Sequence, residues 1–171
     1  EAHEFLRRSG AVTEEPAAAE TLDAAEYRAM LQAPFSPLAW IETPRGEIEI
    51  ELFIGDAPRT VSNFIRLARK GFYDGLRFHR VVPNFVLQAG DPRGDSSGGP
   101  GYTIRCEIGE GLYMRGSVGM ALDGKDPGGS QFFITLLPQP HLNGRYTLFG
   151  HVRDGFAVLD QIEPGDRIRR I

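Results

Sequence analysis

The chain has 171 residues with a hydrophobic fraction of 41% and a charged fraction of 25%, which is typical of one globular domain plus some additional chain. The net charge of −4 lies entirely in residues 1–37, and the neutral remainder has no general attraction for nucleic acid. No apolar run reaches the roughly 20 residues of a membrane-spanning helix, and the single cysteine and four scattered histidines predict neither a disulfide nor a metal centre.

The N-terminal part of the chain, residues 1–37, is acidic and Ala-rich. Asp23 and Glu26 have the spacing of a capping box, which predicts a helix over about residues 23–32. We therefore divide the chain into a partly helical N-terminal extension and a domain over 38–171. The extension is interpreted as a linker or tail. The alternative is that it docks the domain on a partner or joins it to a fused protein.

A hairpin and a helix open the domain. Residues 47–53 read EIEIELF, and this alternation of acidic and apolar residues predicts a half-buried strand. The turn PRG at 44–46 pairs it with the strand LAWIET at 38–43. A helix is predicted over 58–71, with proline in its first turn and glycine at its left-handed cap.

Short strands separated by Gly- and Pro-rich loops fill most of the remaining chain. They are predicted at 78–82, 85–89, 117–122, 130–136, 147–152 and 167–171. A second short helix is predicted over 156–162. Many short strands and two helices predict a mainly β fold, in which a closed antiparallel barrel of roughly eight strands is capped by two α-helices.

Three motifs in this domain resemble the cyclophilin family of peptidyl-prolyl cis-trans isomerases: FHRVVPNFVLQAGD at 78–91, GSQFFITL at 129–136 and HLNGRYTLFGHV at 141–152. The resemblance covers residues 38–171, and its loops look bacterial. It implies an isomerase that rotates Xaa–Pro bonds in proline-containing peptides and in unfolded or flexible protein segments, as a monomer and without a cofactor. The compartment stays open between a bacterial cytoplasm and a periplasm or cell envelope.

This reaction requires no nucleophile, metal or nucleotide, because only the rotation about a partial double bond is slow, with a barrier of ~18–20 kcal/mol. The enzyme needs an apolar pocket for the proline ring, anchors for the flanking peptide, and a donor that binds the twisted amide more strongly than the planar one. Arginine suits the donor role because it stays charged and carries a rigid fork of N–H groups.

Carried over position by position, the resemblance implies a catalytic set of Arg80, Gln88 and Phe85. Arg80 would donate toward the prolyl nitrogen or the adjacent carbonyl, and Gln88 would anchor the substrate backbone and hold the arginine. His79 is expected to be a buried, hydrogen-bonded neighbour of Arg80. The residues implied to bind the substrate, in the proline pocket and the groove beside it, are Val86, Phe133, Leu142, Ala121, Leu122, Gln131, His141, Tyr146 and His79.

Three positions depart from the residues that much of the family carries. Val86 replaces Met and makes the pocket roomier, whereas Tyr146 replaces His and keeps an aromatic wall. His141 replaces a Trp that contacts the inhibitor cyclosporin in the family, so we predict weak cyclosporin binding with isomerase activity retained. The alternative function is a proline-binding module or chaperone domain with incidental activity. The presence of Arg80 favours the enzyme.

Overall fold

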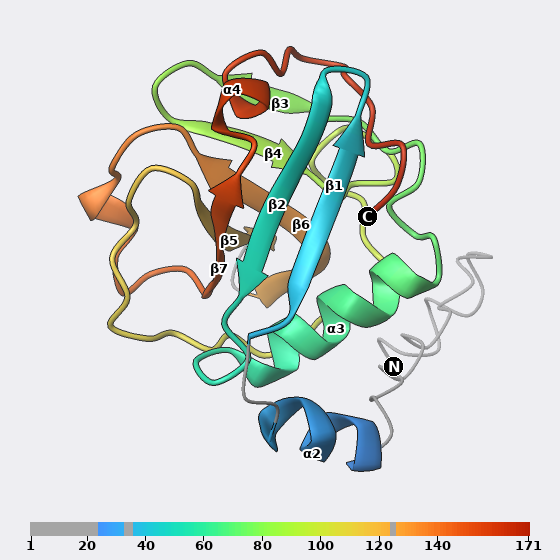
Figure 1. Ribbon diagram of the computed structural model, residues 1–171, viewed down its shortest axis with the longest axis vertical. Coiled ribbons are helices and arrows are strands. Elements are labelled where there is room, and N and C mark those ends of the chain that lie inside the picture. The colour runs from blue at the N-terminus through green and yellow to red at the C-terminus, as the bar shows by residue number, and fades with distance from the viewer. Residues whose placement is uncertain (1–23, 33–35, 124–125) are drawn as a thin grey trace, which may run out of the picture.

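Seven antiparallel strands form one curled sheet in the computed structural model, which describes residues 24–32, 36–123 and 126–171 (Figure 1). The strand order is β1-β2-β7-β5-β6-β4-β3. Each strand corresponds to a predicted one, with ends that differ by a few residues. The strands are β1 (Leu38–Thr43), β2 (Gly46–Leu52), β3 (Arg80–Val82), β4 (Val86–Ala89), β5 (Ser117–Asp123), β6 (Asp126–Thr135) and β7 (Leu148–Asp154).

The C-terminal segment joins the two edges of this sheet, β1 and β3, without forming an eighth strand. It makes only isolated bridges, Arg167 with Arg77 and Arg170 with Glu42. Because its backbone bonds first to the chain ahead of β3 and then to β1, no run of neighbouring pairs builds a ladder. The predicted mainly β, antiparallel fold is confirmed, with seven strands in a curled sheet in the described part of the chain where a closed barrel of roughly eight was expected.

The core is built from the alternating face of β2 and a group of aromatic rings. Ile48, Ile50 and Leu52 are fully buried, as their spacing predicts. Phe64 packs among three further rings, with ring centroids 5.2 Å from Tyr73, 5.5 Å from Phe132 and 5.4 Å from Phe149. Aromatic side chains bury large apolar areas, so this cluster holds the helix that carries Phe64 against the sheet.

That helix, α3 (Pro58–Arg69), receives its N-terminal cap from a distant loop. Its own N-cap residue, Ala57, has no side chain that could accept a hydrogen bond. Instead, the carboxylate of Glu107 accepts hydrogen bonds from the backbone N–H of Arg59 at 3.0 Å and from the backbone N–H and hydroxyl of Thr60, both at 2.8 Å. The negative charge also suits the positive end of the helix dipole.

The other helices are short. Helix α2 (Ala24–Gln32) confirms the helix predicted near the end of the N-terminal extension, and η1 (Pro140–Leu142) is a single 3-10 turn. Helix α4 (Phe156–Leu159) is shorter than the helix predicted over 156–162. None of the helices in the described ranges has the length and apolarity of a membrane span.

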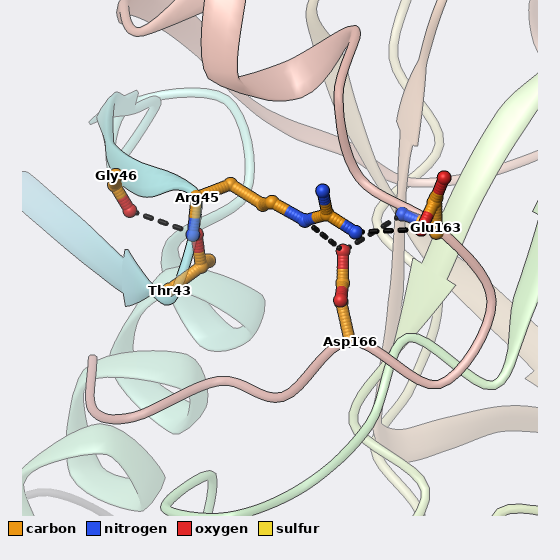
Figure 2. Close-up of polar contacts among 5 residues, drawn as sticks. All are labelled: Thr43, Arg45, Gly46, Glu163 and Asp166. Atoms are coloured by element: carbon orange, nitrogen blue, oxygen red, sulfur yellow. Dashed lines mark hydrogen bonds and ion pairs between the residues drawn. The ribbon is translucent and has the colours of Figure 1, made fainter.

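The turn between β1 and β2 is tied to the loop after α4 (Figure 2). Arg45 donates from Nε to Asp166 at 3.0 Å and from Nη2 to Glu163 at 2.6 Å. Within the turn, the hydroxyl of Thr43 donates to the carbonyl of Gly46 at 2.8 Å. The Glu163 backbone N–H, together with the Arg45 guanidinium, lowers the pKa of Asp166. These contacts fix the C-terminal segment beside the sheet edge that it bridges.

Candidate active site

The hairpin of β3 and β4 carries the catalytic residues that the sequence implies. Its turn is made possible by Asn84, whose φ of 62° is left-handed, a conformation that Asn tolerates better than most residues. The register pairs Arg80 directly with Gln88, so the two side chains lie on one face of the hairpin. Phe85, at the turn, lies under the guanidinium of Arg80, with 5.5 Å between Cζ and the ring centroid.

A cavity of about 190 Å³ lies beside this hairpin. It is much smaller than the pockets of drug-sized ligands, and its size suits a single side chain. Four strands and η1 contribute to its wall, which consists of Arg80, Phe85, Val86, Gln88, Ala121, Leu122, Phe133, Leu142 and Tyr146. The structure thus brings together most of the residues named from the sequence, and it places Gln131, His141 and His79 outside this lining.

The apolar part of the wall forms a small cluster separate from the main core. Phe133 stands at its centre, stacked on Tyr113 with ring centroids 5.6 Å apart and edge-on to Tyr146 at 5.6 Å. Gly119 makes this packing possible, because a Cβ there would lie 2.4 Å from the Phe133 ring and 2.5 Å from the Tyr113 hydroxyl. Two residues that the sequence interpretation did not name, Tyr113 and Gly119, therefore position Phe133 in the pocket wall.

A chain of amide hydrogen bonds leads away from Arg80. Its Nη1 donates to Gln88 Oε1 at 3.4 Å, and Gln88 Nε2 donates to Gln131 Oε1 at 3.0 Å. Gln131, which is only 4% exposed, donates in turn from Nε2 to the carbonyl of Gly98 at 2.8 Å. A backbone carbonyl can only accept, so it fixes the direction of both amides and leaves Gln88 Oε1 facing Arg80.

Asp91 holds the loop that supplies this carbonyl. Its buried carboxylate accepts hydrogen bonds from the backbone N–H of Arg93 at 2.8 Å and of Ser96 at 2.6 Å. Burial alone would raise the pKa of Asp91, but these donors and the N–H groups of Gly94 and Gly98 lower it. A single carboxylate therefore organises the loop, a role that only the folded backbone reveals.

The remaining two predicted residues lie around the pocket in different ways. His141 is exposed on η1 and stacks on Phe85, with ring centroids 5.5 Å apart, so it extends the rim. His79 lines another cavity, because neighbouring residues in extended chain face opposite sides. Its ring nitrogens are buried without the expected hydrogen bond among the described residues. Burial lowers the pKa of His79, and the nearby Asp91 carboxylate opposes this only in part.

Comparison with known proteins places this geometry in a family. Residues 38–170 match the family model described as cyclophilin type peptidyl-prolyl cis-trans isomerase/CLD. The chain is 52% identical over 128 residues to peptidyl-prolyl cis-trans isomerase B of Bacillus subtilis, covering 73% of this chain and 89% of that protein. It is 49% identical over 137 residues to a peptidyl-prolyl cis-trans isomerase of Helicobacter pylori, covering 78% and 84%.

Solved structures agree with these relatives. A cyclophilin type peptidyl-prolyl cis-trans isomerase of Cryptosporidium parvum has a TM-score of 0.74 and 34% identity, covering 80% of this chain and 95% of that chain. The same protein has also been crystallised in the presence of the dipeptide Ala-Pro. The sequence matches, the curled sheet and the convergence of the motif residues on one pocket lead to the same assignment: this chain belongs to the cyclophilin-type peptidyl-prolyl cis-trans isomerases.

Proposed function

We propose that the protein rotates Xaa–Pro bonds by holding the proline ring in the 190 Å³ pocket while Arg80 donates a hydrogen bond to the amide as it twists. A planar amide shares its nitrogen lone pair with the carbonyl, so the nitrogen offers no acceptor. As rotation breaks this resonance, the lone pair returns to the nitrogen. A donor placed above the proline nitrogen therefore binds the twisted state more strongly than either planar state, which is the condition for catalysis.

Arg80 has donors available for this role. Its one hydrogen bond within the described part of the chain goes to Gln88, and its remaining N–H groups are open to a substrate. The bond to Gln88 and the contact with the Phe85 ring hold the guanidinium at the pocket wall. The apolar residues opposite lower the local dielectric, which strengthens a charged donor's interaction with the twisted amide.

The observation that carries the proposal is the meeting of one charged donor with a small apolar pocket. Proline is the side chain that such a pocket suits best, since its ring is compact, apolar and rigid. The structure of the Cryptosporidium parvum relative in the presence of the dipeptide Ala-Pro supports a Xaa–Pro ligand for this chain. Proline-containing peptides and flexible protein segments are the substrates that we infer.

A protease-coupled assay on an Ala-Pro-containing peptide tests the proposal. We expect Arg80→Ala to lower kcat/KM by about 10²–10³-fold, the usual effect of removing one donor from a charge-stabilising site. Arg80→Lys keeps the charge but loses the planar fork of N–H donors, so its kcat/KM should lie between those of wild type and Arg80→Ala. Arg145→Ala, an exposed arginine outside the pocket lining, is the matched control and should leave the rate unchanged. Equal rates for wild type and Arg80→Ala would refute the assigned donor.

A further inference from the structure

A second cavity, of about 390 Å³, lies where the chain ahead of β3 meets the C-terminal segment and the loop after β4. Four basic residues contribute to its lining: Arg77, His79, Arg93 and Arg167. The isomerase mechanism uses none of them, and the cavity shares no residue with the lining of the proline pocket. Its concentration of positive charge therefore needs an explanation of its own.

Two of these arginines face each other directly. Arg77 and Arg167 are partners in an antiparallel bridge, and the flanking hydrogen bonds run from Phe78 N to the Asp166 carbonyl and from Ile168 N to the Leu76 carbonyl. This pattern defines a non-hydrogen-bonded pair, the arrangement that brings opposing side chains closest, with Cα atoms about 4.5 Å apart. Like charges at such a pair destabilise it.

The structure leaves this repulsion uncompensated. Within the described residues, the side chain of Arg77 has no hydrogen-bond or ion-pair partner, and that of Arg167 donates only to the carbonyl of Gly75 at 2.7 Å. The other bridge made by the same segment is different, because Arg170 pairs there with the carboxylate of Glu42 at 2.5 Å. The segment thus matches charges at one bridge and opposes like charges at the other.

The one carboxylate in the lining, that of Asp91, makes no ion pair with the facing arginines among the described residues. Asp91 is 2% exposed and accepts backbone hydrogen bonds from its own loop. Arg93 is partly engaged, since it bonds to Ser97 and lies 3.5 Å from the carboxylate of Asp95. Asp91 keeps its negative charge in the lining, but neither facing arginine has a carboxylate partner among the described residues.

We propose that this cavity binds a phosphate dianion, as inorganic phosphate or as a phosphate monoester. A dianion matches the charge of the facing pair Arg77 and Arg167, and its oxygens suit the planar forks of two guanidinium groups. Placed between them, it turns a repulsive pair into two charge-assisted contacts. The volume of 390 Å³ exceeds the needs of one phosphate and leaves room for an attached group, such as the residue that carries it.

An NMR titration of the full chain with inorganic phosphate, at an ionic strength held constant with sodium chloride, tests the site. We expect saturable amide shifts at residues 75–79 and 165–168 in the wild type. Arg77→Gln and Arg167→Gln should each weaken the fitted affinity at least tenfold, whereas the exposed Arg105→Gln, outside the cavity, should not. Shifts that do not saturate, or that persist in both cavity variants, would overturn the proposal.

A proline-free peptide containing phosphoserine, titrated beside its unphosphorylated form, distinguishes the two sources of the phosphate. Tighter binding of the phosphopeptide than of inorganic phosphate supports the site and assigns it to phosphorylated chains, and equal binding supports a site for the free anion. Failure of both probes to bind overturns the proposal. Because these peptides lack proline, the result does not depend on isomerase activity. Isomerase rates of Arg77→Gln and Arg167→Gln, which we expect to be unchanged, confirm that both variants are folded.

Discussion

At the scale of single residues, the orientation of Gln88 decides whether Arg80 has an acceptor. Gln88 and Arg80 could be named from the sequence because one motif carries both, and a hairpin register brings them face to face. Asp91 lies in the same motif, but its role could not be predicted from the sequence. Its hydrogen-bond partners are backbone N–H groups that converge only in the folded loop. We infer that its buried carboxylate positions Arg80 through hydrogen bonds that involve Gly98, Gln131 and Gln88.

Asp91→Asn tests this indirect role. The substitution keeps the shape but weakens hydrogen bonds to a charged acceptor, so we expect a loss of about 1–3 kcal/mol in the free energy of unfolding. A looser loop should orient Gln131 and Gln88 less well. If this raises the activation free energy by about 1 kcal/mol, kcat falls about fivefold while KM changes little. Asp95→Asn, at an exposed neighbouring carboxylate, is the control. A proportional rise in KM with constant kcat would argue against positioning.

The same carboxylate predicts a pH dependence. Because the folded chain lowers the pKa of Asp91, its contribution to stability is complete above the unfolded pKa of about 3.9 and is lost as the pH falls through the folded pKa. The free energy of unfolding, measured with urea between pH 7 and pH 2, should therefore be higher for wild type than for Asp91→Asn at neutral pH, and this difference should shrink toward pH 2. A constant difference over this range would contradict the assignment.

His141 gives a prediction about inhibition. Its ring stacks on Phe85 at the rim of the pocket and lacks the broad apolar area of the indole that the resemblance implies at this position. We expect His141→Trp to bind cyclosporin about 10–100-fold more tightly than wild type. The affinity of His141→Phe should lie between the two, because it restores apolar area without the indole N–H. Inhibition titrations measure this, and sub-micromolar inhibition of the wild type would contradict it.

At the scale of elements, the sequence predicted those features that depend on residues close together in the chain. The alternation in β2 and the left-handed Gly71 after α3, with φ of 68°, were visible in the sequence because each depends on neighbouring residues alone. The N-terminal cap of α3 was not, because Glu107 lies 47 residues beyond Thr60. Tyr113 and Gly119, which pack against Phe133, were missed for the same reason: their contact with Phe133 exists only in the folded sheet.

Removal of the distant cap should destabilise α3 measurably. Glu107→Gln loses the charge but keeps an acceptor, and should cost about 0.5–1 kcal/mol, whereas Glu107→Ala should cost about 1–2 kcal/mol. Glu110→Gln, an exposed residue in the same loop, serves as the control. Thermal unfolding monitored by circular dichroism gives the comparison. Equal stability of Glu107→Ala and wild type would show that solvent satisfies the helix end equally well.

At the scale of the whole molecule, the C-terminal segment completes a sheet that seven strands leave open. The sequence analysis predicted an eighth strand over 167–171, but the segment changes partners between its two bridges. In contrast, the side chains of helix α2 that the structure describes are exposed. We propose that residues 38–171 are a self-sufficient domain. The truncated chain should unfold cooperatively and keep the kcat/KM of the full chain, and a loss of either would assign the extension a structural role.

Bound-state exchange of an Ala-Pro peptide, measured by two-dimensional NMR at saturating peptide for wild type and Arg80→Ala, tests the central claim most directly. It separates binding from catalysis in one sample. If Arg80 stabilises the twisted amide, the variant will still bind the peptide through the apolar pocket, but its cis–trans exchange will be about 10²–10³-fold slower. Exchange at the wild-type rate in the Arg80→Ala complex would contradict the account.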